Sequence, residues 1–185
     1  MPSYRRWRIE GGAYFFVVVT HERRHIFARS QARRLLREAI ATTQRKRPFA
    51  MEAIVLLPDH LHMIWRLPEG ESDFSTRMAL IKKRFTVAYL TSGGGEGAAT
   101  ASRANHRLRG VWEKRFYEHA IRSAKDYRMH FDYVHLNPVK HGLVAMPREW
   151  SFSSFHRYVR AGMYEKDWCG DQRLPGVVYL EPQWA

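Results

Sequence analysis

The stretch LLPDHLHMIW, residues 56–65, is the most informative part of this chain. Two histidines, His60 and His62, flank one apolar residue inside a run that is typical of a buried strand. Because successive strand residues point to opposite faces, both histidines project from the same face while Leu61 packs into the core behind them. Two imidazoles side by side on a rigid strand supply half of a divalent-metal site.

A histidine pair of this kind also has simpler interpretations. The two side chains could lie on the surface of an antiparallel sheet, or form half of a structural zinc site. A closed zinc site needs four nitrogen or sulfur ligands, and the single cysteine, Cys169, disfavours that variant. The other histidines are scattered without ligand spacing, although we expect His119 to lie near the pair. The pair alone leaves these interpretations open.

The charge of the chain points to a polyanionic partner. The chain has 31 Lys and Arg residues and 18 acidic residues, which gives a formal charge of +13 and a pI near 10.3. Such a balance on a folded domain is typical of nucleic-acid binding. Arginine favours bidentate phosphate contacts, and the abundant aromatic side chains could stack on unpaired bases. Composition therefore favours nucleic acid, with ribosome-associated and RNA-binding proteins among the candidates.

Several classes of protein are disfavoured. One cysteine allows no intrachain disulfide and fits a reducing compartment. No apolar stretch reaches the roughly 18 residues of a membrane helix, and the N-terminus does not resemble a signal peptide. No Gly-x-x-x-x-Gly-Lys loop occurs, so no nucleotide cofactor is expected. We expect a cytoplasmic, nucleoid-associated protein without a membrane partner.

The hydrophobic pattern predicts an α+β fold. Strands are expected at residues 13–20, 51–57, 60–67 and 111–121, and helices at 30–45 and 73–90. A further helix should open at Ser123 or Asp126 and stop by Asn137, because Pro138 cannot accept interior helical geometry. Four strands interleaved with helices predict one antiparallel sheet with helices packed on it.

The second predicted helix has two distinct sides. Its apolar stripe consists of Phe74, Met78, Ile81, Phe85 and Tyr89, and its opposite side carries Lys82, Lys83 and Arg84. The segment at 91–105, rich in Gly, Ala and Ser, is expected to be a flexible insertion. We therefore predict a single domain over residues 1–170, followed by a C-terminal tail at 171–185.

A candidate nucleophile lies on the predicted third helix. Tyr133 and Asn137 are four residues apart, which places them on one helical face. A phenol is a poor nucleophile at neutral pH, and a divalent cation that polarises the target phosphate offsets this. The amide oxygen of Asn137 could complete a metal shell begun by His60 and His62, which would suit magnesium or manganese. Alternatively, Tyr133 anchors the helix and Asn137 caps its end.

These residues resemble the REP-associated tyrosine transposases, a bacterial branch of the single-tyrosine HUH transposases. The resemblance covers about residues 3–170. Its matching segments are SYRR (3–6), LPDHLH (57–62), WEKRF (112–116), DYVHLNPVKHGLV (132–144) and WSFSSFH (150–156). The NPVKHG and WSFSSFH elements are specific to the family, whereas the loop at 91–105 is longer than we expect for it.

The resemblance implies a ferredoxin-like fold and an enzyme that cuts single-stranded DNA at repetitive extragenic palindromic (REP) hairpins. By this resemblance His60 and His62 hold the divalent ion, and Asn137 lies beside or on it. Tyr133 would attack the scissile phosphate, which gives a 5′-phosphotyrosine link and a free 3′-hydroxyl. The expected DNA contacts are Tyr4, Arg5, Arg6, Lys82, Lys83, Arg84, Arg115 and Lys140.

The sequence thus favours a metal-dependent endonuclease and strand transferase, a transposase, with single-stranded or hairpin DNA as its partner. One alternative is a hairpin-binding protein for repeat DNA or RNA that has lost cutting. Another is a metal-dependent nuclease that uses water, in which Tyr133 is structural. Whether the chain acts as a monomer or a homodimer stays open.

Overall fold

A computed structural model describes residues 7–98 and 109–170. Tyr4, Arg5 and Arg6, part of the expected insertion, and the expected tail at 171–185 lie outside the described residues. In the described ranges, no helix is long and apolar enough to cross a membrane.

The centre of the fold is a four-stranded sheet. Its strands are β1 (Ala13–Val19), β2 (Ala50–Leu56), β3 (His60–Arg66) and β4 (Tyr117–Ala120). They lie in the order β2-β3-β1-β4, and all neighbours are antiparallel. Helix α1 (Ser30–Lys46) connects β1 to β2, and α2 (Phe74–Thr91) connects β3 to β4. This is the ferredoxin-like arrangement that the family resemblance implied, and it confirms the predicted antiparallel sheet.

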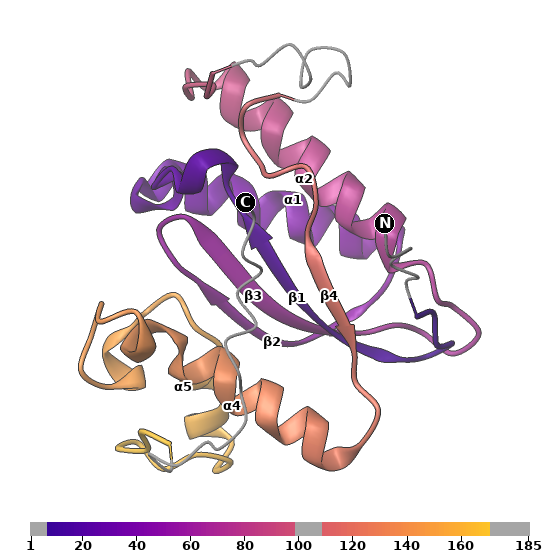
Figure 1. Cartoon of the computed structure of the whole chain (residues 1–185), viewed down its shortest axis with the longest axis vertical. Helices are drawn as coiled ribbons and strands as arrows, with labels where there is room; N and C mark the ends of the chain where they lie inside the picture. Colours follow the sequence, from indigo (N-terminus) through magenta and orange to yellow (C-terminus); the bar gives the residue numbers. More distant parts are fainter. Residues whose placement is uncertain (1–6, 99–108, 171–185) are drawn as a thin grey trace, which may run out of the picture.

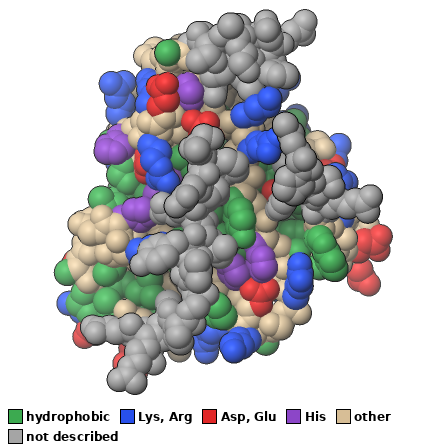
Figure 2. All heavy atoms as spheres, in the orientation of Figure 1, with side chains coloured by type: hydrophobic (Ala, Val, Ile, Leu, Met, Phe, Trp, Pro, Cys, Tyr) green, Lys and Arg blue, Asp and Glu red, His purple; other side chains and the backbone are tan. Residues whose placement is uncertain are grey.

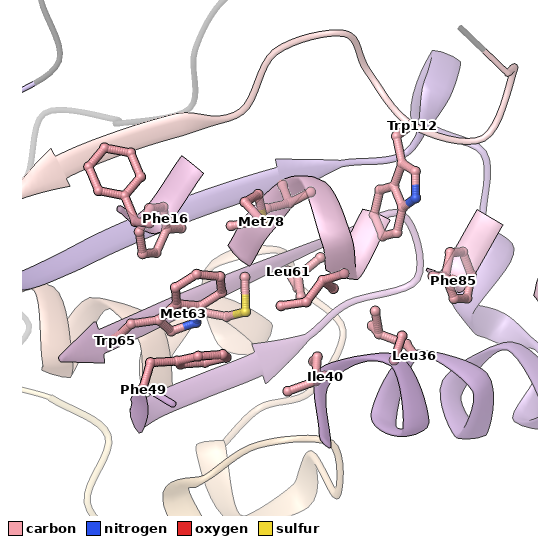
Figure 3. Close-up of a cluster of buried hydrophobic side chains, with 14 of the residues drawn as sticks. Phe16, Leu36, Ile40, Phe49, Leu61, Met63, Trp65, Met78, Phe85 and Trp112 are labelled. Carbon is pink, nitrogen blue, oxygen red and sulfur yellow. The ribbon is translucent and has the colours of Figure 1, made fainter. Parts of the chain in front are cut away.

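Helices α1 and α2 cover one face of the sheet (Figure 1). Figure 3 shows the core between them, where side chains of β1 and β3 such as Phe16 and Trp65 meet Leu36 of α1 and Met78 of α2. The predicted stripe of α2 is confirmed, since all five of its members are buried. Burial of this apolar stripe holds α2 on the sheet.

A second helical layer covers the opposite face (Figure 1). It consists of α4 (Ala124–Lys140) and α5 (Phe155–Arg160). From the sheet, Phe15, Val17 and Val19 point into this second core, while their neighbours in β1 point into the first. Strand β1 is therefore buried on both faces, which explains its uninterrupted apolar sequence.

Three short 3-10 helices complete the described fold. They are η1 (His21–Arg23), η2 (Ile26–Ala28) and η3 (Pro147–Glu149). The first two follow β1 directly, and the third precedes the turn into α5.

Two predicted boundaries were wrong. Strand β4 covers only Tyr117–Ala120. Before it, the chain meets the end of β1 through an isolated bridge between Thr20 and Trp112 and a hydrogen bond from the Glu113 amide to the Val19 carbonyl. Helix α4 does not stop at Asn137 but continues through Pro138 to Lys140. Proline has no backbone N–H to donate, and its ring crowds the carbonyl group one turn earlier. The last turn is nevertheless hydrogen-bonded, because the amides of His141 and Leu143 donate to the carbonyl oxygens of Asn137 and Pro138.

Candidate active site

The histidine pair lies on β3, next to the centre of the sheet. His62 is opposite Val17 of β1 and His60 is opposite Val19, so both side chains point toward α4. His60 is 2% exposed and His62 is fully buried. Their ring centroids are 5.0 Å apart. The same-face geometry that the sequence predicted is confirmed, and a surface location is excluded.

The turn before β3 fixes the orientation of His60. The Asp59 carboxylate accepts a 2.5 Å hydrogen bond from His60 Nδ1 and a 3.1 Å hydrogen bond from Arg23. The backbone amide and hydroxyl of Thr20 both donate to the carbonyl oxygen of Asp59, each at 2.8 Å. Burial alone would raise the pKa of Asp59, but His60 and Arg23 lower it to about 2. Asp59 thus stays charged and leaves His60 Nε2 available on the other side of the ring.

Tyr133 of α4 lies directly over the histidine pair. Its ring centroid is 5.4 Å from that of His62, with the two planes nearly perpendicular. The side chain is almost fully buried, and its hydroxyl accepts a 3.1 Å hydrogen bond from Lys140 Nζ. The phenol oxygen of Tyr133 is therefore next to a cation, on the face of α4 that meets the histidines.

Asn137 lies one turn after Tyr133 and is fully buried. Within the described residues, neither its amide nitrogen nor its amide oxygen has a hydrogen-bond partner. The same holds for His60 Nε2 and for both ring nitrogens of His62. Buried polar atoms are almost always satisfied, so a group of unsatisfied ones needs an explanation. A cation ligated by imidazole nitrogen and amide oxygen would satisfy them, and these residues fit a metal site.

The protonation of His62 suits ligation. Burial lowers its pKa well below the usual value, and electrostatic interactions with His60, His141, Lys140 and Arg23 lower it further. The ring is therefore neutral at physiological pH, and a neutral imidazole is the form that binds metals.

Three residues near the pair were missed from the sequence. Asp59 and Arg23 orient His60, and the His141 ring lies 4.9 Å from the His60 ring. Asp59 directly precedes the pair, and His141 belongs to the NPVKHG element. Their positions in the sequence could have identified Asp59 and His141 as candidates, whereas no nearby motif identifies Arg23.

The residues expected to contact DNA do not gather in one place. Lys140 lies beside Tyr133, whereas Lys82, Lys83 and Arg84 belong to α2, on the other side of the sheet. Lys82 donates to the Glu113 carbonyl. A hollow of about 670 Å³ is lined by Lys82, Lys83, Thr86, Val87, Leu90, Thr91, Arg109, Trp112, Glu113 and Lys114. Basic side chains are spread over several parts of the surface seen in Figure 2. Arg115 is exposed.

Two other tyrosines near α4 are poor candidates for a nucleophile. Burial and the nearby charge of Glu52 raise the pKa of Tyr127. Burial also raises the pKa of Tyr164, whose hydroxyl donates to Asp132 at 2.5 Å. A phenol that is held protonated in this way is a weaker nucleophile than one beside a cation.

His119 lies on the same sheet face as the pair but joins a different group. It lies with Asp126 and His130, and these three residues form a group that could hold a metal ion. No ligand spacing in the sequence pointed to His119 or His130, because the group is assembled from a strand and a helix.

A family model described as "Transposase IS200 like" matches residues 9–137, which include His60, His62, Tyr133 and Asn137. The chain belongs to the IS200-like transposase family. This transposase is 46% identical over 171 residues to the REP-associated tyrosine transposase of Escherichia coli (strain K12), across 92% of this chain and 93% of that protein.

A solved structure supports the same assignment. The transposase is similar to a REP-associated tyrosine transposase bound to a REP hairpin, with a TM-score of 0.76 and 44% identity over 92% of this chain and 93% of that one. The family inferred from the sequence is confirmed, and the chain is an enzyme that acts on DNA.

Proposed function

We propose that this transposase cuts and rejoins single-stranded DNA at REP hairpins through a covalent 5′-phosphotyrosine intermediate. The observation that carries the proposal is the convergence of a buried tyrosine hydroxyl, a lysine ammonium and unsatisfied imidazole nitrogens on one face of α4. REP hairpins are proposed as the substrate because the similar transposase whose structure has been solved is described as bound to a REP hairpin.

His60, His62 and Asn137 are the residues that would hold a divalent ion, Mg²⁺ or Mn²⁺. Their unsatisfied buried nitrogen and oxygen atoms support this assignment. When bound, such an ion would neutralise charge on the scissile phosphate. Asp59 holds the His60 ring in the tautomer that leaves Nε2 available for ligation.

In the proposed reaction, the Tyr133 oxygen forms a bond to phosphorus and the bond from phosphorus to the 3′ oxygen breaks. The phenol proton passes to solvent, and the departing 3′ oxygen takes up a proton to become a hydroxyl. Lys140 stabilises the negative charge that develops on the Tyr133 oxygen, since its ammonium already donates to that atom. The phosphotyrosine link conserves the energy of the broken bond, so rejoining needs no nucleotide cofactor.

Basic residues away from the site are proposed to hold the DNA. Lys83 and Arg115 are exposed and could contact phosphates, as could the N-terminal Tyr4, Arg5 and Arg6. A charge of +13 makes binding of any nucleic acid strongly dependent on salt, so affinity alone does not identify the substrate.

The substrate is tested by comparing two forms of one labelled oligonucleotide in the same buffer. A hairpin with an unpaired 5′ flank should be bound and cut. The same strand annealed to its full complement should not be cut, because a paired strand cannot readily bend a phosphate toward Tyr133. Equal cutting of the duplex would refute the single-strand proposal. Tight binding of the hairpin with no cutting in Mg²⁺ or Mn²⁺ would favour the binding-only alternative.

A further inference from the structure

A second cluster of ligand-type side chains lies beside the candidate active site. His119 is on β4, whereas Asp126 and His130 are on the first turns of α4. His119 Nε2 lies 3.1 and 2.9 Å from the two carboxylate oxygens of Asp126, and His130 Nδ1 lies 2.9 Å from Asp126 Oδ1. One ligand atom from each of the three residues lies within 4.8 Å of the others.

The fold holds this cluster in place. The Ser123 hydroxyl caps α4 by accepting from the Asp126 amide, and the Arg122 amide donates to Asp126 Oδ2. His130 follows Asp126 by one helical turn, so both are on one face of α4. The His119 ring stacks on the His130 ring, with centroids 4.6 Å apart and planes 15° from parallel.

We propose that His119, Asp126 and His130 form a second divalent-cation site, selective for Zn²⁺ over Mg²⁺. Two imidazole nitrogens and one carboxylate oxygen suit zinc-like ions, whereas Mg²⁺ prefers oxygen ligands. Ligand atoms around tetrahedral zinc lie roughly 3.3 Å apart. The two nitrogen-to-carboxylate separations of 2.9 Å therefore need to widen by only a few tenths of an ångström to admit the ion, and the three ligand atoms already lie within 4.8 Å of one another.

The surroundings of the cluster agree with this assignment. Burial lowers the pKa of His130 despite its hydrogen bond to the Asp126 backbone, so the ring is neutral at physiological pH. The side chains of His119 and Asp126 are 28% and 21% exposed, which leaves the cluster open to solvent for entry of the ion. Within the described chain His130 Nε2 has no partner, whereas Nδ1 lies 2.9 Å from both the backbone oxygen and a carboxylate oxygen of Asp126. Ligation through Nδ1 would place the ring proton on Nε2 and replace the hydrogen bond to the backbone.

The second site is separate from the first, although both lie on the same sheet face. The ring of Phe15 lies between them, with centroids 4.8 Å from the His130 ring and 5.7 Å from the His62 ring. An ion at the second site would join β4 to the helix that carries Tyr133, three residues after His130. We infer that it acts as a clamp that holds α4 on the sheet.

The test counts bound zinc. The untagged full-length chain is equilibrated with Zn²⁺, separated from unbound metal and analysed for zinc per chain. His119→Phe keeps a ring to stack on His130 but removes the nitrogen ligand, and should bind one equivalent less. His25→Phe, at an exposed histidine outside the cluster, is the matched control and should bind as much as the wild type. Because the readout is the difference between chains, it does not depend on occupancy of the His60 and His62 site.

Thermal unfolding gives an independent readout. Zn²⁺ should raise the melting temperature of the wild type more than that of His119→Phe, because a ligand that binds only the folded state stabilises it. If His119→Phe does not fold, Asp126→Asn replaces it, since the amide keeps an oxygen for the Arg122 backbone. Equal zinc content and equal thermal shifts in wild type and the folded variant would overturn the proposal and leave the cluster as a hydrogen-bonded cap of α4.

Discussion

Lys140 Nζ lies 3.1 Å from the phenol oxygen of Tyr133, although the two residues are seven positions apart. They meet because α4 continues through Pro138 for a further turn, which brings Lys140 back to the face that carries Tyr133. The ammonium also lies 4.8 Å from the centroid of the tyrosine ring. The phenol is thereby held beside a positive charge.

Lys140→Met should slow DNA cleavage by about 10²-fold, because it removes a donor aimed at the oxygen on which charge develops. Affinity for the hairpin should change little, since one cation among many contributes modestly to phosphate binding. Single-turnover cleavage and a binding titration on the same oligonucleotide separate the two effects. Loss of binding equal to the loss of cleavage would mean that Lys140 is only a DNA contact.

Asp59→Asn should weaken metal-supported cleavage by roughly 10- to 100-fold, as is common when the partner that orients a metal-ligating histidine is lost. The deficit should shrink at high Mn²⁺ concentration, because the ligands themselves remain. Asp73→Asn is the matched control, since Asp73 caps α2 in the other layer and asparagine also caps well. A deficit that is unchanged by the Mn²⁺ concentration would contradict the role assigned to Asp59.

The stability of the enzyme should fall as the pH drops from 6.5 toward 5. Burial lowers the pKa of His135 to about 3, so the unfolded chain takes up a proton in this range and the native chain does not. The unfolded state therefore gains stability as the pH falls, at about 1.4 kcal/mol per pH unit for this residue. His62 and His130, whose pKa values are also lowered, act in the same direction.

Urea unfolding at pH 7.0 and pH 5.0 checks this prediction. His135→Gln should lose less stability between the two pH values than the wild type does, by about 1 to 2 kcal/mol. Asp59 does not affect this window, because its contribution to stability changes only between its usual pKa of 3.8 and its native pKa of about 2. Equal losses in the two chains would show that His135 is not held neutral by the fold.

The central residues of the candidate site could be predicted from the sequence, because the periodicities of a strand and of a helix determine their relative positions. Strand alternation places His60 and His62 on one face, and helical spacing places Asn137 one turn from Tyr133. Long apolar stripes such as that of α2 also indicated which side of each helix packs on the sheet. These features depend on residues that are close in sequence, so they can be read without knowing how distant segments pack.

The remaining features depend on packing between elements. The contact of Lys140 with Tyr133 was missed because Pro138 was expected to end the helix, whereas α4 continues through it to Lys140. The cluster of His119 and His130 joins a strand to a helix, and only their relative position in space brings the rings together. No local spacing could have revealed it.

The central claim is that Tyr133 becomes covalently linked to the 5′ phosphate of the DNA fragment on the 3′ side of the cut, and a denaturing gel tests this directly. Wild-type enzyme incubated with a flanked hairpin in Mn²⁺ should give a protein band that retains label from the 3′ fragment of the strand, while the 5′ fragment is released with a free 3′-hydroxyl. Tyr133→Phe should give no such band. Tyr127→Phe, the matched control six residues earlier on α4, should give it. Cleavage by wild type without any protein-linked DNA, or an adduct that persists in Tyr133→Phe, would contradict the account.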